Sequence, residues 1–204
     1  LGRRNTAGIA MLGLLIGIVF GTVIATTRVI PRTNPVAKFF SGLSGLYVGL
    51  FRGTPIVVQL LVFYYVLMPL MNLHMNSVAV AVVVFGMNSA AYISEIMRAG
   101  ILSVDSGQME GGRAIGLNYA TTMMKIVIPQ AVKNILPTLG NEFISLIKET
   151  SVVSFVGAMD LYVAFNRIGS NSYEFMIPYL VMALIYIVIV LVITLGIKLM
   201  ERSL

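Results

Sequence analysis

Three polar side chains share one face of an otherwise apolar stretch, and their types and spacing are the first in the chain that could do chemistry. Asn88, Tyr92 and Glu95 stand at positions i, i+4 and i+7, so a helix places them on one side. Polar groups inside a membrane span are costly and usually face a partner or a water-filled path. For Asn88 we prefer a translocation path, whereas for Glu95 we prefer a stabilising ion pair with Arg98, three residues away.

A second set of polar side chains lies between residues 136 and 157. Asn141, Ser145 and Lys148 share one helical stripe, and Glu142, Ser145 and Glu149 share an adjacent stripe. These stripes either line the same path or supply ion pairs that hold a bundle together. Lys148 and Glu149 are neighbours in the sequence and do not face each other, so each needs a different partner.

Catalytic chemistry has little support in this sequence. The chain has no Cys and a single His, His74, which excludes a disulfide, a thiolate nucleophile and a multi-histidine metal site. No G-x-x-x-x-G-K-[ST] loop, H-E-x-x-H motif or G-x-S-x-G elbow is present. We therefore expect a protein that is not an enzyme and holds no metal and no cofactor. An active site near Glu110 stays as an alternative.

The composition is that of an integral membrane protein. Hydrophobic residues make up 58% of the chain and charged residues 11%, against roughly 25% charged in a soluble domain. Five runs are long enough to span a bilayer, at residues 6–27, 55–73, 78–97, 136–157 and 176–200. Because lipid cannot bond a bare backbone, we expect an all-α, polytopic helical bundle with about five transmembrane helices.

The distribution of Lys and Arg predicts the orientation of these spans. Most of them fall in the gaps between spans one and two and between spans three and four, or at the C-terminus, including Arg32 and Arg202. The positive-inside rule then places the C-terminus in the cytoplasm and the N-terminus outside. The net charge of +6 is small and scattered, which favours this topology bias over a nucleic-acid partner. Residues 38–51 predict an amphipathic helix along the inner membrane surface.

Glycines four residues apart mark one face of the first span. Gly13, Gly17 and Gly21 line up on a helix and allow another helix to approach closely. Two contacts fit this pattern. The first, which we prefer, is with another helix of the same subunit, and the second is with a neighbouring subunit.

A segment of small residues occupies the longest polar gap, between the third and fourth spans. Its sequence is Glu110-Gly-Gly-Arg-Ala-Ile-Gly116, followed by Ile126-Val-Ile-Pro129. The two adjacent glycines let another surface come close, and Pro129 ends or restarts a helix because it lacks an N–H. We expect this segment at the membrane surface, where a partner outside the membrane can contact it.

The same segment resembles the E-A-A-x3-G-x9-I-x-L-P loop of permease subunits in ABC importers, with Gly111 and Gly112 at the alanine positions and Ile128 at the leucine position. Three further motifs resemble the polar amino-acid subfamily of these permeases. They are Arg52-Gly-Thr-Pro55 with Gln59 and Tyr64-Tyr65, Asn88-Ser-Ala-Ala-Tyr92-Ile-Ser-Glu95-Ile-Met-Arg98-Ala-Gly100-Ile, and Leu139-Gly-Asn-Glu-Phe-Ile-Ser-Leu-Ile-Lys148-Glu-Thr-Ser151. The resemblance runs from about residue 52 to the C-terminus.

This resemblance implies a type I ABC importer permease fold and one transmembrane domain over residues 1–204, with a cytoplasmic coupling-helix loop at about 101–134. It implies a second permease subunit (a copy or a close paralogue), ATPase subunits that hold ATP and Mg, and an extracytoplasmic amino-acid-binding protein. The location it implies is the cell membrane of a prokaryote. The residues it assigns to ATPase coupling are Glu110, Gly111, Gly112, Arg113, Ala114 and Gly116.

The resemblance also selects candidates for contact with cargo. Asp160 stands where the family has the acid of a G-x-x-E-L-T motif, which makes it the first candidate for an amino or guanidinium group of the cargo. Asn88 and Ser89 are the next candidates. We therefore predict the permease subunit of an ATP-driven importer for polar L-amino acids, with basic ones such as arginine, lysine or histidine as a narrower option.

Two other transport functions remain open at this point. One is an ABC permease for a different small solute. The other is a secondary transporter driven by an ion gradient, with Glu95, Lys148 and Glu149 as ion or proton sites.

Overall fold

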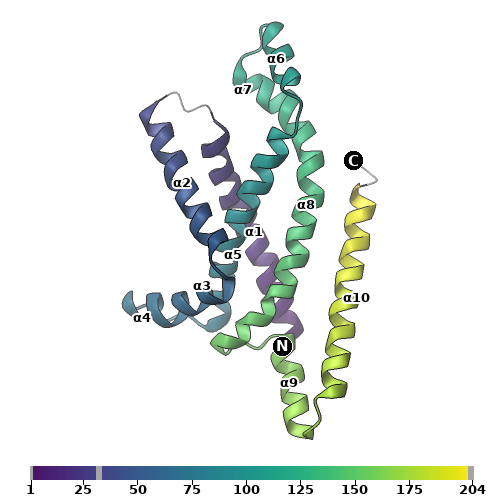
Figure 1. Ribbon diagram of the computed structural model, residues 1–204. Coiled ribbons are helices and arrows are strands. Elements are labelled where there is room, and N and C mark those ends of the chain that lie inside the picture. Colours follow the sequence, from purple (N-terminus) through teal and green to yellow (C-terminus); the bar gives the residue numbers. More distant parts are fainter. Residues whose placement is uncertain (1, 31–33, 202–204) are drawn as a thin grey trace.

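All regular structure in the described part of the chain is helical (Figure 1). The computed structural model describes residues 2–30 and 34–201, so Arg32 and Arg202, which entered the topology argument, lie outside the described residues. The elements in chain order are α1 (Gly2–Val29), α2 (Pro35–Gly53), α3 (Ile56–Val62), η1 (Phe63–Leu67), α4 (Met68–Leu70), α5 (Ser77–Leu102), α6 (Ser106–Ala114), α7 (Tyr119–Thr122), η2 (Met123–Val127), α8 (Ile128–Glu149), η3 (Thr150–Val156), α9 (Leu161–Ser172) and α10 (Met176–Glu201). Of these, η1 and η2 are π-helical and η3 is a 3₁₀-helix.

Small residues join α1 to α5 along their length. Gly17 and Gly21 of α1 lie so close to α5 that an added Cβ would stand 2.6 Å from the Oγ of Ser89 and 2.9 Å from the Cγ2 of Ile93. Gly86 of α5 is equally tight against α1. The contact within the subunit, one of the two explanations offered for the glycine spacing, is therefore confirmed.

The hydrophobic core lies where α1, α3, α5, α8 and η3 meet. Ile9, Leu60, Phe85, Leu146 and Val153 are almost completely buried there, one from each of these elements. Since α5 packs against α1, α2, α3, α8 and η3, it is the central helix against which the others are positioned.

The expected second span is a bent segment. α2 packs on α1 and α5, and the Ile56–Leu70 segment, which holds α3, η1 and α4, leaves it at an angle of 105° (Figure 1). The bend follows from Pro55, which has no N–H and holds Thr54 in an extended conformation with φ −121° and ψ 143°. The predictions of a surface helix over 38–51 and of a separate span over 55–73 are therefore wrong.

Within residues 2–30 and 34–201, three helical stretches are long and apolar enough to cross a membrane: Arg4–Val29 of α1, and the whole of α5 and α10. Two bent pairs also qualify when each is taken as one span. The first is α2 with Ile56–Leu70, and the second is Tyr119–Val156 with α9, which meet at 57°. The predicted all-α bundle of about five spans is thus confirmed, with two of the five broken.

The fourth span begins earlier than predicted. α8 already starts at Ile128, eight residues before the start at residue 136 that hydropathy suggested. Lys133 and Asn134 lower the local hydropathy, and Pro137 lies inside the helix. The segment between α5 and α8 contains α6, α7 and η2.

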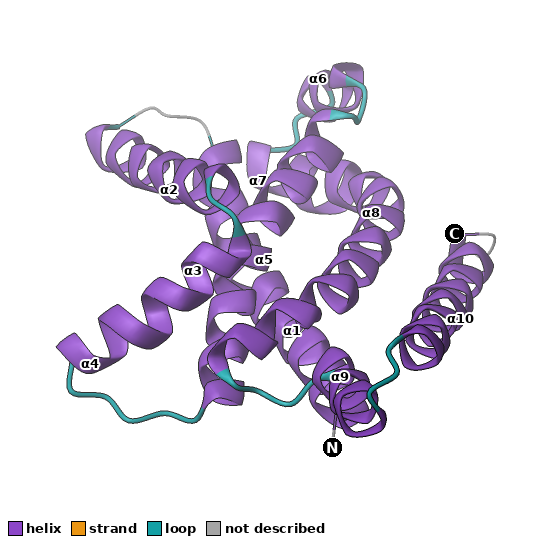
Figure 2. Ribbon diagram, turned by 60° about the horizontal axis from the view of Figure 1, so that its bottom comes forward, coloured by secondary structure: helices purple, strands orange, loops and turns teal. Residues whose placement is uncertain are grey.

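The two ends of the chain lie at opposite ends of the bundle (Figure 1). α6 and α7 project beyond the end where α5 finishes and α8 begins, and the C-terminal end of α10 points the same way. α10 stands at the side of the bundle, where it packs on α8 and α9 (Figure 2). An odd number of membrane crossings places the two termini at opposite ends of a bundle, as is found here.

Candidate functional site

A polar cavity of about 350 Å³ lies beside the bend between α2 and α3. Its walls come from the end of α2, the bend, the middle of α5 and the end of α8. The lining residues are Arg52, Gly53, Thr54, Pro55, Ile56, Asn88, Tyr92 and Glu149. Of the three residues that the sequence suggested for cargo contact, Asn88 lies in this cavity.

Hydrogen bonds between buried amides fix the bend against α5. The Nδ2 of Asn88 donates to the Oε1 of Gln59 over 2.9 Å. The Nε2 of Gln59 donates in turn to the carbonyl of Phe51 over 2.8 Å and to the carbonyl of Thr54 over 2.9 Å. These carbonyls belong to the broken end of α2, where no helical N–H reaches them. Asn88 and Gln59 therefore shape the cavity by satisfying the backbone of the bend.

Two opposite charges line this cavity without pairing. Arg52 and Glu149 are both exposed, and neither forms an ion pair or a side-chain hydrogen bond with any residue in the described ranges. The guanidinium of Arg52 instead lies over the ring of Tyr92, with its Cζ 5.3 Å from the ring centroid. An unpaired cation and an unpaired anion on one cavity suit a ligand that carries both charges.

A second polar cavity, of about 470 Å³, follows the first along α5 toward the α6 end. It is lined by Arg52, Glu95, Ile96, Ala99, Gly100, Ser103, Asn134 and Thr138. Arg52 is the residue that the two cavities share.

Glu95 is held by two arginines at this end of the bundle. Its Oε2 accepts from the Nη2 of Arg98 over 2.9 Å, and its Oε1 accepts from the Nη1 of Arg28 on α1. The ion pair of Glu95 with Arg98 that the sequence predicted is confirmed, and Arg28 is an additional partner that the spacing could not reveal.

Ser89 lies behind the first cavity. It is fully buried between α1 and α8, and its Oγ donates to the Oε1 of Glu142 over 3.3 Å. Ser89 is therefore placed to hold Glu142 and the α1–α5 contact.

Asp160 caps a helix at the end of the bundle opposite α6. Its Oδ1 accepts from the backbone N–H of Val163 over 2.8 Å at the start of α9, and the residue is completely buried. Thr6 of α1 accepts from the neighbouring N–H of Leu161 over 3.3 Å. Asp160 is not among the residues that line either polar cavity.

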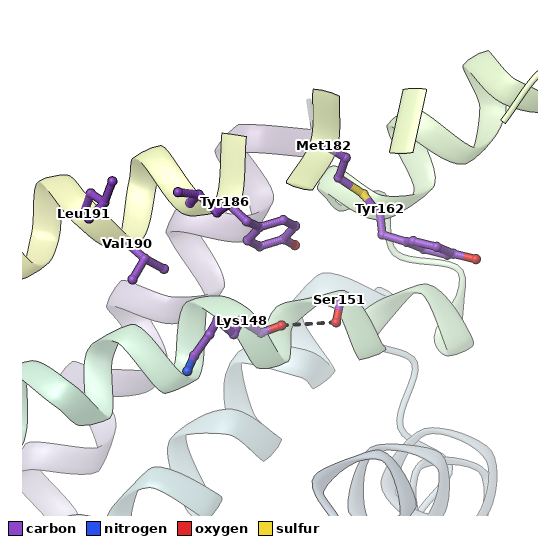
Figure 3. Close-up of a pocket in the computed structure, with 8 residues that line it drawn as sticks. Lys148, Ser151, Tyr162, Met182, Tyr186, Val190 and Leu191 are labelled. Carbon is purple, nitrogen blue, oxygen red and sulfur yellow. Dashed lines mark hydrogen bonds between the residues drawn. The ribbon is translucent and has the colours of Figure 1, made fainter. Parts of the chain in front are cut away.

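Lys148 and Glu149 face different spaces, as their adjacency in the sequence predicted. Glu149 lines the first polar cavity, whereas Lys148 lines a largely apolar groove of about 550 Å³ between α8, α9 and α10. Figure 3 shows Lys148 on α8, Tyr162 on α9 and Tyr186 on α10 around this groove.

One long face of α8 carries polar side chains that nothing in the described chain covers. Asn134, Thr138 and Asn141 are exposed on it, and Lys148 and Glu149 are exposed at its two edges. Exposure of so many polar groups to lipid is costly, so this face needs water or a partner subunit. Most of the polar stripes of the sequence thus lie on the surface of the subunit, whereas Glu142 and Ser145 are half-buried.

The two glycines of the small-residue segment have different surroundings. Gly112 is buried, and an added Cβ would stand 3.0 Å from the Oγ1 of Thr122 and 3.2 Å from the Cδ1 of Ile126. Gly111 has open space around it, and Glu110 next to it is exposed. Gly112 therefore packs α6 onto α7 and η2, while Gly111 leaves a bare outer surface. Arg113 and Ala114 are exposed as well.

Gly116 ends α6 by adopting a left-handed conformation with φ +90°. Its N–H donates to the carbonyl of Arg113 over 3.0 Å, and the N–H of Leu117 donates to the carbonyl of Gly112 over 3.2 Å. This pair of bonds is a Schellman motif, for which glycine is the preferred residue. The third glycine of the segment is thus explained by the helix end.

Arg52 and Gln59 belong to one motif of the sequence and Glu149 to another, and the sequence does not indicate that the three lie close together. Gln59 is a polar residue in an apolar run, and this was the available signal. Their meeting depends on the 105° bend, which periodicity does not reveal.

Comparisons with known proteins agree with this fold. The sequence profile of the family described as "binding-protein-dependent transport system inner membrane component" matches residues 13–204. The arginine transport system permease protein ArtQ of Bacillus subtilis is 36% identical over 203 residues, which cover 100% of this chain and 90% of the relative. The glutamine transport system permease protein GlnP, as proposed for Rickettsia prowazekii, is 34% identical over 99% of this chain and 90% of the relative.

Two kinds of solved structure are also similar. A chain from "an amino acid ABC transporter with histidines" has a TM-score of 0.91 and 37% identity, and covers 100% of this chain and 92% of its own length. A chain of the MetNI methionine ABC transporter has a TM-score of 0.82 at 18% identity, with 99% and 94% coverage, which shows likeness of fold alone.

Proposed function

This chain belongs to the family of binding-protein-dependent transport system inner membrane components, and from that premise we propose which solute it carries and by what route. It is a permease subunit of an ABC transporter, a multi-pass protein of the inner membrane and a transport subunit whose ATPase is a separate subunit. This membership decides against the secondary transporter and the membrane enzyme that the sequence left open.

The proposed cargo is an L-amino acid, and one observation carries the proposal. Arg52 and Glu149 line the same cavity of about 350 Å³ without pairing to each other or, within the ranges described, to other residues. A free amino acid carries a carboxylate and an ammonium group close together, so it matches an unpaired guanidinium and an unpaired carboxylate. Asn88 adds an amide to this cavity and remains a proposed contact.

The narrower proposal is a polar and basic cargo such as arginine, lysine or histidine. Its support is the name of the arginine permease among the relatives and the histidines named with the similar solved structure. Glutamine and L-cystine permeases are also among the relatives, so polar amino acids form the wider class.

Asp160 and Ser89 were also candidates for cargo contact. The capping bond of Asp160 and the buried contact of Ser89 with Glu142 support a different role, in which both residues stabilise the helices around the path. We propose that neither meets the cargo directly.

The proposed route runs through the two polar cavities and along the exposed face of α8, with a second permease subunit on the other side. We propose that this second subunit is a copy or a close paralogue and that an amino-acid-binding protein docks at the end that holds the N-terminus, outside the cell. Arg28 and Arg98 near the opposite end support a cytoplasmic position for α6 and the C-terminus.

The proposed coupling surface is the outer face of α6. Glu110, Gly111, Arg113 and Ala114 are exposed there, while Gly112 and Gly116 hold the shape of the segment. A partner ATPase that contacts this face would pass the closure caused by ATP and Mg to α8 through η2. ATP can drive this step only if the complex binds it better in one conformation than in the other.

The test is to purify the chain with its ATPase subunit, reconstitute both in lipid with the binding protein, and screen amino acids for stimulation of ATP hydrolysis. We expect stimulation by one or a few polar L-amino acids. A complex that only a sugar, a peptide or an inorganic ion stimulates would contradict the proposal.

A further inference from the structure

Arg52 lies between two polar cavities that follow one another along the bundle, and it lines both of them. On α5, Asn88 and Tyr92 line the first cavity, and Glu95 and Ser103 line the second. On antiparallel α8 the order reverses, as geometry requires, with Glu149 at the first cavity and residues 134 and 138 at the second. A solute that moves from one cavity to the other along α5 therefore passes the side chain of Arg52.

The position of Arg52 lets it move without disturbing the core. It lies on the last turn of α2, directly before the bend, and its neighbour Gly53 has open space where a side chain would stand. Phe51, on its other side, is buried and holds the backbone through the amide of Gln59. The backbone is thus fixed while the long side chain of Arg52 remains free to change its rotamer.

The interaction that holds Arg52 in place is weak and replaceable. Its guanidinium lies 5.3 Å from the centroid of the Tyr92 ring, and it makes no ion pair within the described ranges. A cation–π contact at an exposed site is weaker than a bidentate pair between a guanidinium and a carboxylate. A carboxylate that enters the first cavity can therefore draw Arg52 away from Tyr92.

We propose that the stack of Arg52 on Tyr92 is a gate between the two cavities, and that the α-carboxylate of the cargo opens it. The inference rests on the proposed function and deepens it, because it names the chemical group by which an amino acid is admitted. In the closed state the stack separates the cavities. When the carboxylate binds Arg52, the ring is released, and Glu149 balances the ammonium group on the outer side.

The first test measures recognition of the carboxylate. The permease–ATPase complex is placed in lipid nanodiscs without the binding protein, and L-arginine binding is compared with that of L-argininamide, which lacks the carboxylate charge. We expect the wild type to bind the amide at least about tenfold more weakly, and Arg52→Ala to reduce this preference to about twofold or less. Arg52→Lys, which keeps the charge but loses the planar fork, should fall between them.

The matched control is Arg167→Ala. Arg167 is exposed on α9 and lines neither cavity, so this variant should keep the wild-type preference. An Arg52→Ala complex that assembles normally and still prefers the acid by the wild-type factor would overturn the inference.

The second test measures the gate itself through Tyr92. Tyr92→Leu removes the ring face, so the complex in proteoliposomes should leak L-arginine without ATP at least about fivefold faster than the wild type. Tyr92→Phe keeps the ring and should be as tight as the wild type. Leakage that is equal in the Leu and Phe variants would count against a gate at this position.

These outcomes separate the inference from its premise. If the wild-type complex binds no amino acid and none stimulates hydrolysis, the proposed function fails. If the wild type binds L-arginine but Arg52→Ala keeps its preference for the acid, the gate alone fails.

Discussion

Asp160 caps α9 with one carboxylate oxygen, and this bond decides what its replacement should do. Asp160→Ala removes the acceptor for the N–H of Val163 and should cost about 1 kcal/mol of stability, whereas Asp160→Asn keeps an acceptor and should cost little. Thermal unfolding of the purified complex in detergent measures both effects.

The same pair of variants tests a direct contact of Asp160 with cargo. We expect uptake of arginine and of glutamine to change by the same factor in each variant, since a cap does not distinguish cargoes. A selective loss of arginine uptake in Asp160→Asn would restore the direct contact that the motif suggested.

The site shows which residue roles a sequence can predict. Asn88 was predicted as a path residue because an amide inside an apolar helix needs a polar neighbour, and it lines the cavity that we propose as part of the path. Arg52 and Glu149 lie almost a hundred positions apart, and only the bend at Pro55 brings them to one space. The capping role of Asp160 was missed because a lone acid after Gly157 has the same sequence signal as a loop residue.

At the scale of the helix, the contact of α1 with α5 depends on the absence of side chains. Gly17→Leu should overpack this contact and cost about 1–3 kcal/mol, because its Cβ would meet Ser89 at 2.6–2.8 Å. Gly8→Leu, on the same helix but with open space around it, should be nearly neutral. Thermal unfolding that gave equal losses for the two variants would contradict the packing described here.

The two glycines of α6 offer a matched pair for testing the coupling surface. Gly111→Trp places a ring on the exposed face and should weaken ATPase docking about tenfold or more while α6 stays folded. Gly112→Trp instead pushes α6 away from Thr122 and should lower the stability of the whole segment.

Co-purification of the ATPase and protease resistance of the segment between α5 and α8 separate the two effects. Full ATPase retention in Gly111→Trp would show that docking occurs elsewhere. Protease resistance in Gly112→Trp equal to that of the wild type would contradict the inner packing role of this glycine.

For the whole molecule, the exposed polar face of α8 makes a prediction about its surroundings. The chain has no Cys, so single cysteines can be placed without background. Asn141→Cys on this face should react with a polar, membrane-impermeant thiol reagent, because the proposed route along α8 gives water access to it. Leu184→Cys on α10, where Leu184 is 61% exposed on an apolar surface, should stay unlabelled in lipid.

Labelling of the assembled transporter in proteoliposomes gives the comparison. Equal protection of both positions, with normal assembly, would show that water does not reach Asn141 and would remove this part of α8 from the proposed route.

The number of spans followed from composition, but their shapes did not. α1, α5 and α10 were predicted closely because an uninterrupted apolar run of this length has few alternatives to a straight helix. The broken spans were misplaced at Pro55 and around Pro137, because a hydropathy average cannot separate a polar residue that ends a helix from one that lines a path. In α2 the buried Ser41, Val48 and Phe51 show a packed face that the average had assigned to the membrane surface.

The glycine contact between α1 and α5 also limits where the transporter can change shape. Because almost no side chains separate α1 from α5, these two helices must move as one rigid body. The ring of Tyr92, which lies on α5, therefore keeps its position relative to α1 when the transporter opens. The part that moves is then the side chain of Arg52, and the amide hydrogen bonds of Gln59 and Asn88 hold the backbone from which it moves. Temperature or mutation that loosens those amides should therefore alter the speed of transport before it alters the melting of the bundle.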